Sequence, residues 1–486
     1  MPNAIAYLML LLWPVVCLIL FRTQKLERAL IWSILGGYLF LPPLAEFNLP
    51  LVPAMDKVSI PNLSVLLLLL FAVKDKVQLS PHSRTAAWLA VGLILSAIPT
   101  VLTNGDPIIF EVLENADPIV FFIDALPGQS VRDIGSVLIA QVLTLVPFLL
   151  ARQFLSTEDG LRELLLAFMV GGLIYSIPSL IEIRFSPQMN VWVYGFFQHS
   201  FEQMMRAGGF RPIVFLPHGL WLALFMVIAL LAAAALARVT PKIDRWKMLA
   251  LVIYLFVVLV LCKSLASLAY GVALLPLVLL APYRWQIRLA VLFAVVAVGY
   301  PMLRNAGVIP TQAIVAWVEG FNPARAQSLE YRFNNEEQLL VRAAEKPLFG
   351  WGGWGRSLLR DSETGEILTI PDGRWIIVFG TFGWLGYVCE FGLLGLPLIL
   401  MGLYLRRHGD ARLNPYVAPL TLILGITMMD MLLNATLTPL TWLTAGAILG
   451  HAERIMPRPV PRPRHALDGA VMTGSPAKVQ GRRTVL

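Results

Sequence analysis

The chain has 486 residues, of which 57% are hydrophobic and only 14% are charged. Soluble domains are on average about 45–50% apolar and about 25% charged. The composition therefore excludes soluble globular, disordered, fibrous and disulfide-stapled proteins. It indicates a polytopic membrane protein, in which each helix satisfies its own backbone groups within lipid. The net charge of +8 is typical of a membrane topology signal, so no nucleic-acid partner is expected.

Long apolar runs recur from the first residues to the C-terminal tail. A bilayer core about 30 Å thick is crossed by about 20 helical residues, and runs near this length predict an all-α transmembrane bundle of about 12–13 spans. We place these spans near residues 4–21, 29–45, 61–73, 86–103, 133–151, 162–181, 213–237, 247–262, 265–281, 288–303, 375–404, 416–434 and 437–451. The three cysteines (Cys17, Cys262 and Cys389) lie in apolar segments, which predicts no disulfide and no thiolate metal site.

Basic residues are concentrated in alternate connections between the predicted spans. They follow the first apolar run and do not precede it, which is the reverse of a signal peptide and predicts an anchor with its N-terminus outside. Every second connection is again basic, so the positive-inside rule predicts a multi-pass protein of the cytoplasmic (inner) membrane with a cytoplasmic C-terminus. The predicted parts are transmembrane helices over 1–303 with outer loops at 104–130 and 184–212, a large extracytoplasmic loop over 304–374, transmembrane helices over 375–452, and a disordered basic cytoplasmic tail over 453–486.

The large predicted loop contains an amphipathic stretch. Residues 328–346 place Leu329 and Phe333 on one helical face and pair Arg332 with Glu336 at i, i+4. Two interpretations stay open. The helix lies on the bilayer with solvated charges, or Arg332 enters a site and clamps a phosphate, a task that suits its planar, permanently charged fork.

A glycine-rich run, Gly350-Trp-Gly-Gly-Trp-Gly355, follows this stretch. It formally fits the dinucleotide-binding pattern, but Lys346-Pro347 precedes it where that motif needs a buried strand. Glycines at this density instead predict a tight turn with its backbone close to a ligand. Trp351 and Trp354 either stack on a sugar face or belong to the interfacial aromatic belt.

Two arginines, Arg206 and Arg211, lie on the predicted outer side, against the positive-inside trend, which favours a function for them. His218 begins the next span, either as a hydrogen-bonded packing residue or as a catalytic one. Asp372, where the large loop re-enters the membrane, is either a general base or the N-cap of the following helix.

Three of these segments together resemble one family. They are Arg206-Ala-Gly-Gly-Phe-Arg-Pro212, Lys346-Pro-Leu-Phe-Gly-Trp-Gly-Gly-Trp-Gly355 and Asp372-Gly-Arg-Trp-Ile-Ile-Val-Phe-Gly-Thr-Phe-Gly-Trp-Leu-Gly-Tyr387. In this order, with a large outer loop between late helices, the chain resembles the superfamily of O-antigen ligases and O-antigen polymerases over roughly residues 130–450.

The resemblance implies a metal-independent, inverting glycosyltransferase of cell-envelope polysaccharide assembly that needs no cofactor. Its donor would be a glycan on undecaprenyl diphosphate, and its acceptor a sugar hydroxyl on lipid A core, another lipid-linked glycan or a polysaccharide. Arg211 and Arg332 match the family's diphosphate-binding arginines by position. The family's His-Asn pair at the end of the loop is replaced here by Pro371-Asp372-Gly373, so either Asp372 acts as the base or the acceptor chemistry differs. The further substrate-binding candidates are Arg206, His218, Glu336, Trp351, Trp354, Arg356 and Arg374.

The residues leave one other class open. A transporter or flippase of lipid-linked oligosaccharide would work through charges inside or at the ends of the spans. The candidates for that role are Glu390, Asp430 and Lys263.

Overall fold

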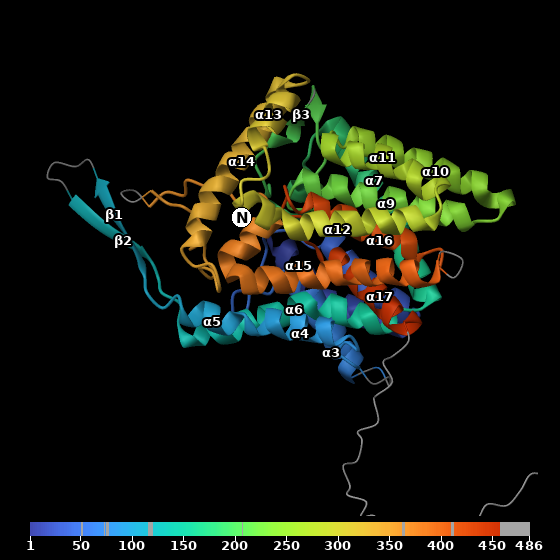
Figure 1. The fold of residues 1–486 in the computed structure, drawn as a ribbon, viewed down its shortest axis with the longest axis horizontal. Helices are drawn as coiled ribbons and strands as arrows, with labels where there is room; N and C mark the ends of the chain where they lie inside the picture. Colours follow the sequence, from blue (N-terminus) through green and yellow to red (C-terminus); the bar gives the residue numbers. More distant parts are fainter. Residues whose placement is uncertain are drawn as a thin grey trace, which may run out of the picture.

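The computed structural model describes residues 1–49, 52–71, 73, 77–114, 120–206, 208–361, 365–409 and 413–456. The chain is mostly helical, at 71%, and its helices lie side by side in one bundle (Figure 1). The helices are α1 (Ala4–Thr23), α2 (Leu26–Phe40), α3 (Ser59–Phe71), α4 (Arg84–Leu95), α5 (Ala97–Leu102), α6 (Val131–Phe154), α7 (Glu158–Phe185), α8 (Met189–Tyr194), α9 (Gly219–Val239), α10 (Lys242–Leu261), α11 (Leu265–Leu280), α12 (Tyr283–Asn305), α13 (Thr311–Glu319), α14 (Pro323–Ala344), α15 (Arg374–His408), α16 (Val417–Asp430) and α17 (Pro439–Ile455).

Seven of the described helical segments are long and apolar enough to cross a membrane. They are α1, the combined α4–α5, α6, α7, α9, α12 and α15. Each predicted span overlaps a helix, so the helical class with membrane-spanning candidates is confirmed, whereas the number of crossings stays a prediction.

Two small hairpins depart from the all-α expectation. Strands β1 (Ile108–Glu114) and β2 (Val120–Leu126) pair antiparallel and extend away from the bundle (Figure 1). Strands β3 (Met205–Arg206) and β4 (Gly209–Phe210) form a shorter pair that leads toward α9. Both hairpins fall within the loops predicted at 104–130 and 184–212.

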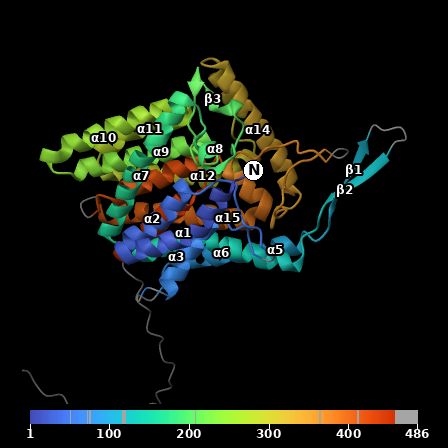
Figure 2. The same cartoon turned by 180° about the vertical axis from the view of Figure 1, so that it is seen from behind.

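The two ends of the bundle carry different elements. The N-terminus, the β1–β2 hairpin, α13 and α14 gather at one end, which we call the α14 end (Figures 1 and 2). The connection between α9 and α10 and the last turn of α17 lie toward the opposite end, which we call the α9–α10 end. Of the tail predicted to be disordered over 453–486, residues 453–455 belong to α17, and the residues after 456 lie outside the described part of the chain.

Helix α9 occupies the centre of the bundle. It is apolar on all sides, as expected of a helix without a solvent-facing side, and 89% of its apolar window is buried. It packs against α7, α10, α11 and α16. Because His218 and the preceding loop lead directly into α9, the loop is anchored to the centre of the molecule.

Helix α15 is broken at Gly383, whose φ of 64° and ψ of −161° are not helical. A straight helix would hold Arg374 and Glu390 about 24 Å apart, yet Arg374 Nε lies 2.7 Å from Glu390 Oε1. The chain therefore turns back on itself at Gly383. The span predicted at 375–404 is two helical segments, because hydropathy does not detect a change of backbone direction at a glycine.

The glycine-rich run closes onto this break. The backbone N–H groups of Trp351 and Gly352 donate to the carbonyls of Gly380 and Thr381, and Pro347 O accepts from the N–H of Trp384. A Cβ at Gly350 would lie 2.4 Å from the backbone carbon of Thr381. Gly350 thus allows close backbone-to-backbone packing against α15, whereas a Cβ at Gly352 would meet the side chain of Gln129.

Helix α14 begins earlier than predicted. Asn322 caps its first turn by accepting from the N–H of Arg325, and Pro323 occupies its first position, so the helix runs from residue 323 and not from 328. The predicted Arg332–Glu336 pair is wrong. Glu336 accepts from Arg304 Nε at 2.9 Å because it faces the end of α12.

Candidate functional site

The loop between β4 and α9 is held by a buried carboxylate. Glu182, in the last turns of α7, is fully buried and accepts three backbone N–H groups. Its Oε2 accepts from Ile213 at 2.7 Å and Val214 at 2.8 Å, and its Oε1 accepts from Met189 at 3.0 Å. The carboxylate thereby fixes the direction in which the chain leaves β4.

Three more side chains complete this scaffold. Tyr175 OH accepts from the N–H of Phe215 at 3.0 Å, and Gln198 Nε2 donates to Val214 O at 2.8 Å. Lys57 Nζ donates to Phe215 O at 2.8 Å. Burial lowers the pKa of Lys57 to about 7, with nearby Asp56 opposing the shift. The loop is thus rigidly supported although it has no regular secondary structure.

Arg211 emerges from this scaffold with its side chain buried. Its stem packs over Gly219, where a Cβ would lie 2.5 Å from Arg211 Cδ. The guanidinium Nη2 donates to Lys263 O at 3.4 Å, and Nε has no hydrogen-bond partner among the described residues. Lys263 Nζ in turn donates to Arg206 O at 3.0 Å, so the short β3–β4 hairpin is tied to the same corner.

Arg332 approaches this corner from α14. Its Nη1 donates to Leu433 O at 3.0 Å and to Asn434 Oδ1 at 3.1 Å, and its Nε lies 3.6 Å from Asp372 Oδ2. The N-cap of α15 is Gly373, without a side-chain cap bond, so Asp372 is not a helix cap. Burial raises the pKa of Asp372, and the charge of Arg332 partly opposes the shift.

Four arginines from three segments, namely β3, the loop before α9 and helix α14, thus share one electrostatic environment. Burial, followed by the charges of Arg206, Arg325 and Arg332, lowers the pKa of Arg211 to about 10. Burial likewise lowers the pKa of Arg206, followed by the charges of Arg325 and Arg332. We call Arg206, Arg211, Arg325 and Arg332 the arginine cluster.

The arginine cluster is poorly compensated. Within the described part of the chain, no carboxylate forms an ion pair with Arg206, Arg211 or Arg325. Repelling cations that are partly withdrawn from water favour the binding of an anion. A group with several negative oxygens, such as a diphosphate, fits this requirement best.

His218 lies beside the arginine cluster and caps α9. Its Nδ1 accepts from the N–H of Leu220 at 2.9 Å, so Nε2 carries the proton and faces Gln203 Oε1 at 3.5 Å. Burial lowers the pKa of His218 to about 3, with His199, Arg211, Arg332 and Arg206 adding to the shift. The imidazole is therefore neutral at pH 7 and offers an N–H donor.

The other predicted charged residues have internal partners. Glu336 binds Arg304 and Tyr300, and Arg374 binds Glu390 through two nitrogen–oxygen contacts. Among the acids predicted for transport, Glu390 is therefore neutralised. The other, Asp430, accepts from Asn434 Nδ2 at 3.0 Å and Thr436 Oγ1 at 2.7 Å.

The predicted aromatic residues differ from one another. Trp351 is buried, with the guanidinium of Arg342 3.4 Å from its ring centroid and Lys346 Nζ 4.5 Å from it. Trp354 is 55% exposed and remains accessible to a ligand. Arg356 is buried and donates to the carbonyls of Pro127 and Asp106, so it joins the loops at the foot of the β1–β2 hairpin.

The space beside Asp372 is narrow. A crevice of about 10 Å³ is lined by residues that include Arg332, Glu336, Asp372 and Leu433. This is about the least space that holds one water molecule, so the crevice does not admit a sugar in this arrangement.

Sequence reasoning missed several residues of this site. Arg325 lies seven positions before Arg332, which is two helical turns, and this spacing is the signal that would have found it. Glu182, Gln198 and Lys57 act on backbone groups far away in the chain, and no local pattern announces them. Within the described residues, no group of three or more His, Cys, Asp or Glu side chains is placed to hold a metal ion.

Neither models of known protein families nor curated protein sequences match this chain. What the fold itself defines is a mostly helical protein whose described part includes seven helices suited to crossing a membrane.

Proposed function

We propose that this protein is a membrane glycosyltransferase of cell-envelope polysaccharide assembly. It transfers a glycan from undecaprenyl diphosphate to a sugar hydroxyl of a lipid or polysaccharide acceptor at the outer face of the cytoplasmic membrane. The observation that carries the proposal is the arginine cluster, in which three of four arginines have no ion-pair partner among the described residues and the fourth lies beside Asp372.

The cluster suits a diphosphate leaving group. When the bond between the anomeric carbon and the diphosphate oxygen breaks, its electron pair stays on that oxygen. Cations that are already in place stabilise this charge without reorganising. Arg206 and Arg211 would contact the diphosphate from the loop before α9, and Arg325 and Arg332 from α14.

Asp372 supplies the complementary function. The acceptor hydroxyl oxygen forms the new bond to the anomeric carbon from the opposite side, and its proton passes to the Asp372 carboxylate. A carboxylate whose pKa is raised by burial is a better proton acceptor than an exposed one. The products are the inverted glycoside and the polyprenyl diphosphate.

The test uses a deletion strain complemented with single variants. Arg211→Ala and Arg332→Ala are each expected to restore no product and to leave the lipid-linked donor accumulated, because the leaving-group charge is no longer compensated. Arg184→Ala is the matched control, since Arg184 is an exposed arginine near the end of α7. Lipid-linked glycans and membrane protein levels are measured together. Normal product with both variants at normal protein level would refute the proposal.

A second variant examines the base. Asp372→Asn is expected to reduce transfer by about 10²–10⁴-fold, the usual contribution of a general base. In the wild type the rate should rise with pH as Asp372 loses its proton, and this dependence should vanish in Asp372→Asn. A pH-dependence that persists in the variant would assign the base role to another group.

A further inference from the structure

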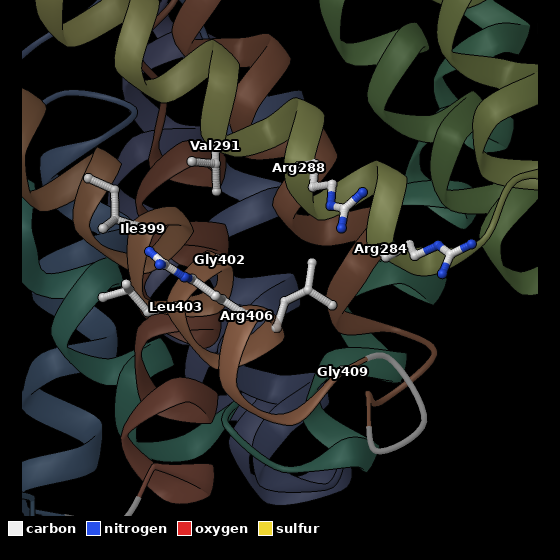
Figure 3. Close-up of a pocket in the computed structure, with 9 residues that line it drawn as sticks. Arg284, Arg288, Val291, Ile399, Gly402, Leu403, Arg406 and Gly409 are labelled. Carbon is white, nitrogen blue, oxygen red and sulfur yellow. The ribbon is translucent and has the colours of Figure 1, made fainter.

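A separate pocket lies at the α9–α10 end of the bundle, between the first turns of α12 and the last turns of α15 (Figure 3). Its volume is about 590 Å³. Three arginines line it together with apolar side chains and two glycines. The lining residues are Arg284, Arg288, Val291, Ile399, Gly402, Leu403, Leu405, Arg406 and Gly409.

On both helices, a charged residue of the pocket lies near the helix end and an apolar residue lies deeper in the bundle. On α12, Arg284 lies near the end of the helix, and Val291 follows seven residues deeper. On α15, Arg406 lies near the end, and Ile399 lies seven residues deeper. Seven residues of helix span about 10 Å, so on each helix a charged residue lies near the outer end of the pocket and an apolar residue about 10 Å deeper.

The helices approach each other closely at the inner end of this pocket. A Cβ at Gly402 would lie 2.8 Å from Val291 Cγ2, so the absence of a side chain there allows the contact. Ile399 and Leu403 are each 41% exposed, which leaves the apolar part of the pocket open at the side of the bundle. Figure 3 shows Ile399 and Leu403 on the same side of the α15 ribbon, with the guanidinium of Arg406 extending toward them.

The charge of the pocket is uncompensated by the described chain. Arg284, Arg288 and Arg406 are exposed, and no described carboxylate forms an ion pair with any of them. The N-terminus of the long helix α12 adds a positive dipole end at the same place. Trp285 is 49% exposed, with Arg288 5.0 Å from its ring centroid, as is common for tryptophan at the boundary between lipid and water.

We propose that this pocket binds one anionic phospholipid. Its phosphate lies among Arg284, Arg288 and Arg406, and one acyl chain lies along Ile399 and Leu403. Basic pockets between membrane helices are suited to lipid phosphate because each cation near the surface strengthens the attraction. A free phosphate would leave the apolar half of the pocket unfilled, and a lipid without net charge would leave the three arginines uncompensated.

The test measures lipid binding to the full-length protein after lipid removal in detergent. Native mass spectrometry counts bound dioleoyl phosphatidylglycerol and bound dioleoyl phosphatidylcholine in separate titrations. The wild type is expected to bind phosphatidylglycerol at least tenfold more tightly. The triple variant Arg284→Gln, Arg288→Gln, Arg406→Gln is expected to lose this preference.

A control variant carries the same change of charge at the same end. Lys242→Gln, Lys247→Gln, Arg407→Gln alters three basic residues that do not line the pocket, and it should keep the preference. If the first triple variant does not fold, Arg288→Gln alone should still weaken phosphatidylglycerol binding at least threefold.

Three outcomes would overturn the proposal. The first is a wild type that shows no preference for phosphatidylglycerol. The second is a control triple variant that loses as much of this preference as the pocket variant does. Alternatively, glycerol phosphate displaces the bound lipid at concentrations similar to those of the lipid itself, which would make the pocket a site for a free anion. None of these results bears on the arginine cluster, so the glycosyltransferase proposal is tested independently.

Discussion

The buried carboxylate of Glu182 offers a sharp test of how the arginine cluster is positioned. Replacing it with alanine leaves three backbone N–H groups, those of Met189, Ile213 and Val214, without an acceptor. Each unsatisfied buried donor costs about 1–3 kcal/mol, so Glu182→Ala is expected to lower the free energy of unfolding by roughly 3–6 kcal/mol after partial relaxation.

The conservative variant Glu182→Gln should be less destabilised than Glu182→Ala but more destabilised than a variant of an exposed residue. In Glu182→Gln, the amide oxygen can keep the bonds from Ile213 and Val214, but the amide nitrogen then faces the N–H of Met189. One acceptor is lost, for a cost of about 1–3 kcal/mol. The control is Glu163→Ala on the same helix, which removes only a partly exposed pair with Arg28 and should cost about 0–1 kcal/mol.

Denaturant unfolding of the detergent-purified protein, followed by tryptophan fluorescence, measures all three variants. The expected order of destabilisation is Glu182→Ala, then Glu182→Gln, then Glu163→Ala. If Glu182→Ala is no less stable than Glu163→Ala, the loop before α9 does not depend on this carboxylate and the reasoning fails.

Two further predictions concern backbone conformation and pH. Gly383→Ala should destabilise the protein by more than about 3 kcal/mol, since it combines a strained positive φ with a backbone clash. The control is Gly299→Ala in α12, where a Cβ meets nothing within 4 Å. In the same unfolding assay it should change the stability by no more than about 1 kcal/mol. For His218, the unfolded chain binds a proton below about pH 6.5 but the folded chain only near pH 3, so stability is lost as pH falls through this range, by up to about 2 kcal/mol between pH 7 and 5. His218→Asn keeps an N-cap and should lose less stability over that interval, and equal losses in both proteins would contradict the assignment.

The helices were predictable because hydropathy responds directly to burial and to lipid. Hydropathy does not predict where the backbone changes direction, since it carries no information about backbone angles. The break at Gly383 lies inside a continuous apolar run, and only the tertiary contact between Arg374 and Glu390 reveals that the chain turns back there. The start of α14 was misplaced because Asn322-Pro323, a helix-start signal, was not used.

The candidate site was predicted in part. Arg211 and Arg332 were singled out from their position and chemistry, and the structure places them in one electrostatic environment. The glycines of 350–355 were predicted to bring backbone close to a ligand. In the structure Gly350 lies against the backbone of α15 and Gly352 against the side chain of Gln129. Residues such as Glu182 were invisible because their role is defined by partners about 30 positions away.

The contact between the glycine-rich run and the broken helix α15 has a consequence for Asp372. Backbone hydrogen bonds run from both sides of the break to residues 347–352, so the glycine-rich run ties the two segments of α15 together. Asp372 lies two residues before the first of these segments. The acceptor of the proposed reaction would need room made by displacement of neighbouring elements, because the crevice beside Asp372 is narrow.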